Sequence, residues 1–341
     1  MLNTNHLIDP DQKLMPLSRS MPRYPVLDGW RGLSILCVLA AHMLPLGPKS
    51  WQLNFTAGVL GMCLFFTLSG FLIASTLIYH SSIRDFLIRR LCRILPLAWA
   101  FLLLVLPLTA ATPDIYWAHF LFYANLPPFW LTNLTAHFWS LCIELQFYLF
   151  IALFVALLKQ RGLLLLPALC LAVTTGRIWQ HETVSIVTYY RVDEILAGAC
   201  LALVYKARLG NLLPRFLGWV NSYLLLGLLL ISCHPASGLV NYLRPYLAAA
   251  LVGSTLYQSQ TRLSRWLMAH TLTYIATISY ALYVIHPVTM YGWLGSGNNG
   301  IVKYTKRPLS FLLTFGLAHF STFHYEKHWI AWGKSWISRV R

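Results

Sequence analysis

The sequence predicts an all-α, polytopic membrane protein with about ten transmembrane helices, on the basis of three observations. The 341-residue chain is 57% hydrophobic and only 11% charged, whereas roughly a quarter of the residues in soluble domains are charged. Its mean hydropathy is +0.60. Apolar stretches recur along nearly the whole chain, and short polar or basic connections separate them. We therefore expect a helical bundle in a lipid bilayer.

Ten apolar segments are candidates for spanning helices, because a span needs about 20 mostly apolar residues. The fifth and the eighth are short. We expect residues 1–26 to form a cytoplasmic lead-in, 27–325 the transmembrane domain, and 326–341 a basic cytoplasmic tail. The ten segments are 27–46, 57–79, 90–110, 138–158, 162–177, 192–207, 216–233, 244–258, 272–292 and 308–325.

The distribution of Lys and Arg predicts the orientation of the chain. Most of the 26 basic residues fall in the connections that face the cytoplasm if both termini are cytoplasmic, as the positive-inside rule requires. The 111–137 connection has no Lys or Arg and is predicted to lie outside. Its aromatic and Pro-bearing sequence fits either a position at the membrane interface or a loop folded back into the bundle.

Composition also bears on partners and ligands. The net charge of +16 is better explained by basic loops than by nucleic-acid binding, because no soluble domain remains to host a nucleic acid. The seven cysteines are scattered and form no C-x-x-C pair, so we expect neither a metal site nor a disulfide framework. The sequence does not indicate an oligomeric state.

Ionisable residues inside spans usually mark functional paths. Arg31 and His42 are 11 residues apart, so on an ideal helix they lie about 16 Å apart, roughly 20° from perfect alignment on one face. Arg31 is then near the cytoplasmic end and His42 well across the bilayer. We expect both side chains to line one internal path.

Further polar residues are arranged in the same way across the membrane. Arg90 and Arg93 lie at the cytoplasmic start of the third span, where they could clamp a phosphate, whereas Arg89 is interpreted as an orientation anchor. Residues suited to acid–base work lie deeper or toward the outside. His137 and Glu144 are seven apart and are expected to share a helix face. The other deep or outward residues are Asp193 and His286.

Seven strings in order resemble acyltransferase family 3, a family of integral-membrane O-acyltransferases that includes enzymes acting on bacterial surface polysaccharides. The resemblance covers about residues 26–330 and departs from the family pattern at Leu145 and His328. The strings are LDGWRGLSILCVLAAH (containing Asp28), FFTLSGFLI (containing Ser69), RRLCRILP, HFWSLCIELQFYLF, RVDEILAG, ISYALYVIHPV and FHYEKHWI.

The resemblance implies transfer of an acyl group, typically acetyl from acetyl-CoA, to a carbohydrate hydroxyl by a multi-pass protein of the bacterial inner membrane. It implies that His42 is essential and that Arg31, Arg90 and Arg93 are required. The acceptor stays open among O-antigen of lipopolysaccharide, other polysaccharides, lipid-linked glycans and small natural products. Acetyl-CoA would be a co-substrate, and no tightly bound cofactor is expected.

Acyl transfer to a hydroxyl needs a base, stabilisation of the oxyanion and close approach of donor and acceptor. We expect His42 to be the base and Glu144 to orient it, if the first and fourth spans are neighbours. Asp28, Ser69, His137, Asp193 and His286 are expected to support the site. Direct transfer and an acetyl-histidine intermediate both remain open. The alternatives are a transporter of a lipid-linked or acylated substrate and a non-catalytic membrane subunit.

Overall fold

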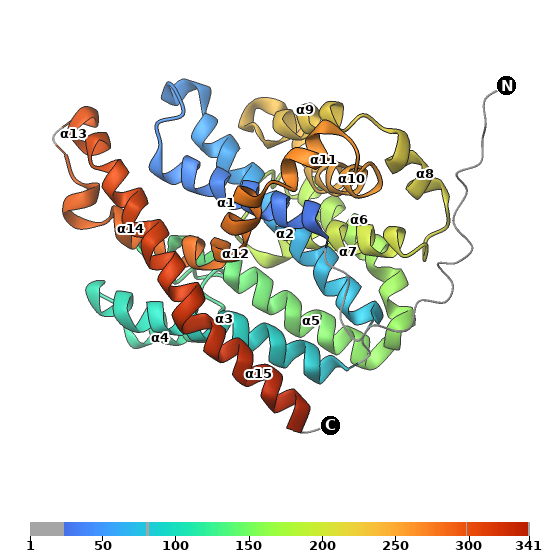
Figure 1. Ribbon diagram of the computed structural model, residues 1–341, viewed down its shortest axis with the longest axis horizontal. Helices are drawn as coiled ribbons and strands as arrows, with labels where there is room; N and C mark the ends of the chain where they lie inside the picture. The colour runs from blue at the N-terminus through green and yellow to red at the C-terminus, as the bar shows by residue number, and fades with distance from the viewer. Residues whose placement is uncertain (1–23, 80–81, 298, 340–341) are drawn as a thin grey trace.

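The computed structural model describes residues 24–79, 82–297 and 299–339, and these residues contain helices but no strand. The all-α prediction is therefore confirmed, while most of the predicted lead-in, residues 1–23, lies outside the described residues. The helices are α1 (Pro25–Met43), α2 (Leu53–Tyr79), α3 (Ile83–Val105), α4 (Pro113–Phe120), α5 (Trp139–Gly162), α6 (Leu166–Trp179), α7 (Asp193–Tyr205), α8 (Leu212–Trp219), α9 (Ser222–Cys233), α10 (Arg244–Tyr257), α11 (Arg262–Leu267), α12 (His270–Ile285), α13 (Gly300–Thr305), α14 (Arg307–Phe320) and α15 (Lys327–Arg339) (Figure 1).

Each of the ten predicted segments contains a helix, but the helices differ in their capacity to span a bilayer. Four stretches of the described chain are long and apolar enough, and the pair α8–α9, bent by 95°, is a possible fifth. The 14 residues of α6 or α10 extend only about 21 Å, less than the roughly 30 Å hydrocarbon core. The number of spans and the orientation stay predictions. The four stretches are Pro25–Met43, Lys49–Tyr79, Ile83–Leu108 and Ala136–Trp179.

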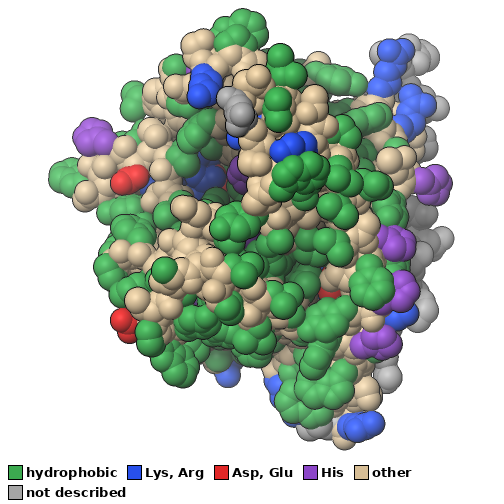
Figure 2. Space-filling view, turned by 90° about the vertical axis from the view of Figure 1, so that its left-hand side faces the viewer, with side chains coloured by type: hydrophobic (Ala, Val, Ile, Leu, Met, Phe, Trp, Pro, Cys, Tyr) green, Lys and Arg blue, Asp and Glu red, His purple; other side chains and the backbone are tan. Residues whose placement is uncertain are grey.

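The outer surface of the bundle is strongly apolar. Large side chains such as Leu104, Leu157 and Leu312 are at least 70% exposed, and hydrophobic side chains cover much of the face seen in Figure 2. An exposed apolar surface of this extent is unfavourable in water and favourable in lipid. The chain is accordingly a multi-pass membrane protein.

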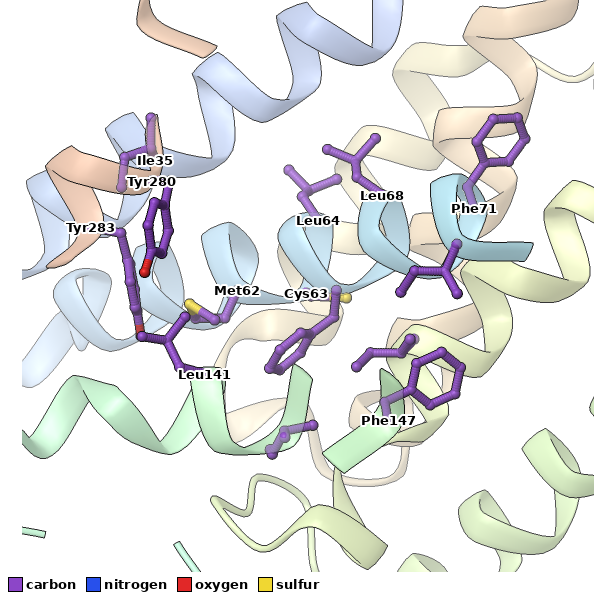
Figure 3. Packing of buried hydrophobic residues seen from close by; sticks show 14 of the residues in the cluster. Ile35, Met62, Cys63, Leu64, Leu68, Phe71, Leu141, Phe147, Tyr280 and Tyr283 are labelled. Carbon is purple, nitrogen blue, oxygen red and sulfur yellow. The ribbon is translucent and has the colours of Figure 1, made fainter. Parts of the chain in front are cut away.

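Helix α2 packs against α1 on one side and α7 on the other, and α12 packs against α1. Side chains from α1, α2, α5 and α12 meet in the interior (Figure 3). They include Ile35, Met62, Leu141, Tyr280 and Tyr283. This packing brings residues far apart in the sequence around one interior region.

Helices α2 and α7 contact each other directly through their backbones. A Cβ atom added at Gly70 would lie 1.8 Å from the carbonyl oxygen of Ile195, and one added at Gly198 would lie 1.9 Å from that of Thr67. No real side chain fits at such distances, so only glycine permits this approach. Small residues at helix contacts are the usual means by which membrane helices pack closely.

The 111–137 connection folds back into the bundle, which is one of its two predicted positions. His119 and Asn125 are fully buried. The Asn125 amide donates to the Ile186 carbonyl and to Thr188 Oγ1, both at 2.9 Å. Gln146 of α5 donates to the carbonyl of Phe122 at 2.7 Å. These bonds satisfy backbone groups that an apolar environment would leave unpaired.

Most of the predicted basic cytoplasmic tail, residues 326–341, is helical, and its position relative to the membrane stays a prediction. A π-helical turn, Ser321–Glu326, joins α14 to α15, and the helix continues to Arg339. Helix α15 packs against α3, where Gly333 faces Cys92 and Ile337 is buried. Close packing on α3 explains why this basic segment is helical.

Replacing Gly198 by Ala should destabilise the protein by about 1–3 kcal/mol or more, because the new methyl group overlaps the α2 backbone. The matched control is Gly227→Ala in α9, where an added Cβ meets nothing within 4 Å. Thermal unfolding in detergent should show a lower midpoint for the first variant and no loss for the second. Equal midpoints for the two variants would contradict the backbone contact.

Candidate active site

Three histidines from different parts of the chain meet at one end of the bundle. His42 lies in the last turn of α1, His286 caps the end of α12, and His137 lies in the 3-10 turn Ala136–Phe138 before α5. His42 Nδ1 lies 2.9 Å from His286 Nε2, and the two rings are nearly parallel, with centroids 5.1 Å apart. The His137 ring approaches the edge of His286 with centroids 5.4 Å apart.

The hydrogen bonds assign the tautomers of the neutral pair. His286 Nδ1 lies 2.8 Å from the Tyr283 carbonyl oxygen, which can only accept. Nδ1 of His286 therefore carries the hydrogen, its Nε2 accepts, and His42 donates from Nδ1. This leaves the lone pair of His42 on Nε2. A neutral imidazole with an unshared lone pair is suited to accept a proton.

The histidines line a cavity of about 790 Å³. The hollow is visible in Figure 2, with basic and histidine side chains inside it. Its volume falls within the roughly 300–1,000 Å³ typical of small-molecule sites. Polar and aromatic side chains share the lining with many apolar ones; the polar and aromatic members besides the three histidines are Asn54, Phe55, Asn133, Trp139, Ser185, Arg191 and Tyr283.

A second, smaller cavity of about 40 Å³ holds the predicted arginines. Arg31, Arg90 and Arg93 all line it, as predicted for a shared basic site. Arg31 Nη1 lies 3.6 Å from Asp28 Oδ1, and the Arg90 guanidinium lies over the Tyr148 ring, 5.5 Å from its centroid. Several basic side chains around one cavity favour an anionic ligand.

Glu144 belongs to the arginine cavity and not to His42, so the expected orienting contact is wrong. Its Oε1 accepts hydrogen bonds from Ser69 Oγ at 2.9 Å and from Tyr148 OH at 2.6 Å. The partner of His42 is His286. His137 lines the histidine cavity and Glu144 lines the arginine cavity, so these two predicted residues belong to different sites.

Arg31 and His42 occupy opposite parts of α1 but line two cavities rather than one open path. Phe65 lines the arginine cavity and Tyr283 lines the histidine cavity, and their rings stack with centroids 6.4 Å apart and an angle of 8°. Tyr283 is held by hydrogen bonds to Ser140 Oγ at 2.6 Å and to the His137 carbonyl at 2.5 Å. These two stacked rings thus join the lining of one cavity to the lining of the other.

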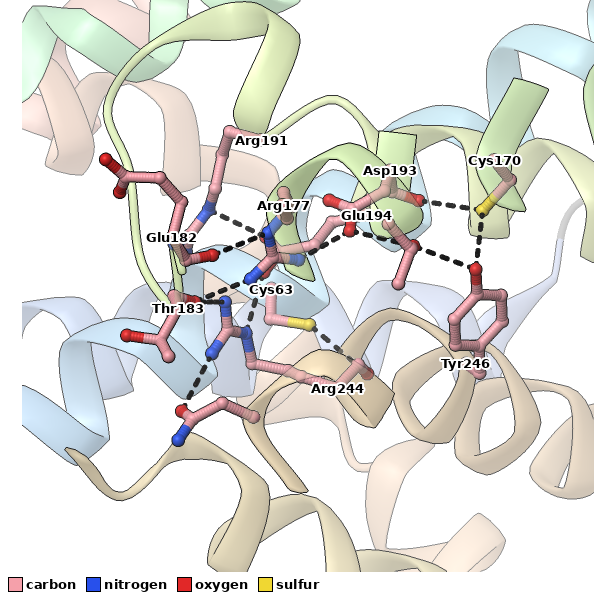
Figure 4. A network of polar contacts seen from close by, with 12 residues as sticks. Cys63, Cys170, Arg177, Glu182, Thr183, Arg191, Asp193, Glu194, Arg244 and Tyr246 are labelled. Carbon is pink, nitrogen blue, oxygen red and sulfur yellow. Dashed lines mark hydrogen bonds and ion pairs between the residues drawn. The ribbon is translucent and has the colours of Figure 1, made fainter. Parts of the chain in front are cut away.

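A network of buried charges borders the histidine cavity (Figure 4). Asp193 Oδ2 pairs with Arg177 Nη1 at 2.5 Å, so this predicted supporting residue has a structural contact and lines neither cavity. Glu194 Oε1 accepts from Arg244 Nε at 2.8 Å, and its Oε2 lies 3.2 Å from Arg191 Nε. All five of these side chains are at most 1% exposed.

The sequence profile of the family described as "Acyltransferase domain" matches residues 24–324, which contain both cavities and the charge network. The chain belongs to this family. This membership confirms the resemblance seen in the sequence motifs.

Curated relatives of the acyltransferase chain carry related names. It is 27% identical over 313 residues to the "Peptidoglycan O-acetyltransferase OatA" of Listeria monocytogenes, covering 77% of this chain and 48% of the relative. It is 30% identical over 228 residues to the "Putative peptidoglycan O-acetyltransferase YrhL" of Bacillus subtilis, covering 56% and 35%. A putative O-acetyltransferase of Staphylococcus aureus is 25% identical over 314 residues, covering 79% and 51%. The chain thus spans about half or less of each relative, and no solved structure matches it significantly.

Arg191 lies in the RVDE string just before the sixth predicted segment, and no role was predicted for Arg191, Phe65 or Tyr283. Arg191 could have been found from RVDE, because three charges before an apolar segment are costly unless they pair. The two aromatic residues carry no such signal, since Phe and Tyr are common throughout this chain.

Replacing Glu194 by Gln should destabilise the protein strongly, by about 3–5 kcal/mol, because it leaves buried guanidinium groups without their carboxylate. Glu182→Gln is the matched control, since Glu182 is only half-buried and the network contacts its backbone carbonyl, which the substitution keeps. The measurement is the midpoint of thermal inactivation in detergent. A Glu194→Gln protein as stable as the control would show that the charge network contributes little.

Proposed function

We propose that this protein is a membrane O-acetyltransferase that moves an acetyl group from acetyl-CoA to a hydroxyl of a cell-surface carbohydrate. The observation that carries the proposal is the pairing of two cavities in an acyltransferase-family chain: one is basic, and the other presents the unshared lone pair of His42. The printed names of the relatives support acetyl as the group and a glycan as the acceptor. We expect the protein in the bacterial inner membrane.

His42 is proposed as the general base. Its Nε2 removes the proton of the acceptor hydroxyl while the oxygen attacks the thioester carbonyl. The tetrahedral intermediate then collapses, the C–S bond breaks, and the departing coenzyme A thiolate takes the proton from the His42 imidazolium. His286 holds the ring through the 2.9 Å hydrogen bond and stabilises the imidazolium by accepting from Nδ1. His286 thereby takes the part that the sequence had suggested for Glu144. The same lone pair would attack the thioester if an acetyl-histidine intermediate forms.

The arginine cavity is proposed to hold phosphates of the donor. Arg90 and Arg93 are i, i+3 neighbours on α3, and Arg31 faces them from α1. Phosphate oxygens form strong, charge-assisted hydrogen bonds with guanidinium groups. The pantetheine arm would extend from this cavity toward His42, about 16 Å farther along α1, past Phe65 and Tyr283.

Replacing His42 by Ala should lower kcat by about 10²–10⁴-fold, because the general base is lost. His286→Phe keeps the ring but removes the acceptor, and the loss of one hydrogen bond should lower kcat by roughly 3–10-fold. The control is His319→Ala, whose ring bonds Tyr274 on the exposed surface. Transfer is measured with purified protein, labelled acetyl-CoA and oligosaccharide acceptors. Full transfer activity in His42→Ala would refute the proposed base and favour a transport or non-catalytic role.

Replacing Arg90 or Arg93 by Ala should raise KM for acetyl-CoA by roughly 10–100-fold, the equivalent of one lost charge-assisted bond of about 1.5–3 kcal/mol. Arg89→Ala is the matched control, since Arg89 lies exposed on the same turn. The variants should show no added defect with acetyl-pantetheine, which lacks the nucleotide phosphates. Equal defects with both donors would contradict phosphate binding at this cavity.

A further inference from the structure

Arg191 is a buried cation whose position the acetyl-transfer chemistry does not explain. It follows the 3-10 turn Thr188–Tyr190, is 1% exposed, and lines the histidine cavity. Its guanidinium lies over the Trp139 ring, 5.5 Å from the centroid. Its Nε forms an ion pair with Glu194, but neither Nε nor Nη1 has a hydrogen-bond partner. Buried guanidinium nitrogens are rarely left in this state.

The charges of the network do not balance. Its three guanidinium groups face two carboxylates, and Glu194 is shared between Arg191 and Arg244. One positive charge is therefore in excess among these five buried side chains. An uncompensated charge in a low-dielectric interior is costly, so a counter-ion at this position would be favoured strongly.

The excess positive charge lies at the cavity, because the other two arginines of the network already have hydrogen-bond partners. Arg177 pairs with Asp193 and also donates to the carbonyls of Glu182 and Thr183. Arg244 donates to Glu194, to the Thr183 carbonyl at 3.0 Å and to Asn241 Oδ1 at 3.4 Å. Of the three, only Arg191 lines the histidine cavity and lacks such partners.

We infer that Arg191 binds a carboxylate of the acceptor, so that the enzyme acts on acidic sugars. This inference rests on the proposed function of the same cavity. A guanidinium group matches a carboxylate with two parallel hydrogen bonds. Trp139 and Asn133 line the same cavity and offer an apolar contact and an amide to the sugar. The guanidinium group carries its charge before the reaction begins. We therefore expect it to pair with a group of the acceptor that is already anionic, and so to determine the affinity for the acceptor.

The test uses two disaccharides that differ only in one group, a glucuronic-acid disaccharide and its carboxyl-reduced glucose counterpart. Binding is measured on the full chain in detergent with His42→Ala and without acetyl-CoA, so that no acetyl group is transferred. The parent protein should bind the acidic disaccharide at least about tenfold more tightly, the minimum expected for a hydrogen-bonded charge. Arg191→Gln should abolish this preference, Arg191→Lys should keep part of it, and Arg208→Gln, on the exposed surface, should leave it unchanged.

Transfer kinetics with His42 present separate a binding role from other roles. For Arg191→Gln, the KM for the acidic acceptor should rise at least about tenfold while kcat stays within a few-fold and the neutral acceptor is unaffected. Three results would overturn the inference: no preference for the acidic sugar in the parent, an unchanged preference in Arg191→Gln, or an equal fall of kcat with both acceptors. Carboxylate-dependent binding without any acetyl transfer would instead contradict the proposed function and leave the inference about Arg191 standing.

Discussion

The direct backbone contact of α2 with α7 is the constraint on which the arrangement of both cavities depends. At Gly70 and Gly198 the two helices approach so closely that no side chain separates them. This contact fixes the part of α2 around Gly70, and α2 also packs against α1. Its cavity-lining residues, Asn54, Phe65 and Ser69, are thereby placed at set positions between α1, α5 and α12.

The same contact sets the position of the charge network, because Asp193 and Glu194 open α7. The carboxylates enter the bundle at the level where Arg177 and Arg244 arrive from α6 and α10. A close helix pair and a set of buried ion pairs thus support each other: the packing excludes water, and the exclusion of water makes each unpaired charge expensive.

Local sequence patterns were sufficient for features that depend on one helix at a time. Hydropathy placed a helix in all ten predicted segments, and helical spacing brought Arg90 and Arg93 to one cavity. Contacts between helices were not predictable from spacing. The partner of His42 comes from the end of α12, 244 positions away, and His137 and Glu144 line different cavities although they are only seven residues apart. The number of spans depends on the lengths of the helices. Sequence patterns do not define the ends of short helices such as α6 and α10, so the number of spans was not predictable.

The stacked rings of Phe65 and Tyr283 also matter for the membrane as a permeability barrier. Each cavity carries polar groups into an apolar bundle, and joined cavities would form a wet channel through which protons and small ions could leak. The two rings, with centroids 6.4 Å apart, would oppose the formation of such a channel. The acyl–pantetheine arm of the proposed donor is a thin chain. It could pass between the cavities if little more than these two rings moved. The acyl transfer proposed above would then require no open channel through the membrane.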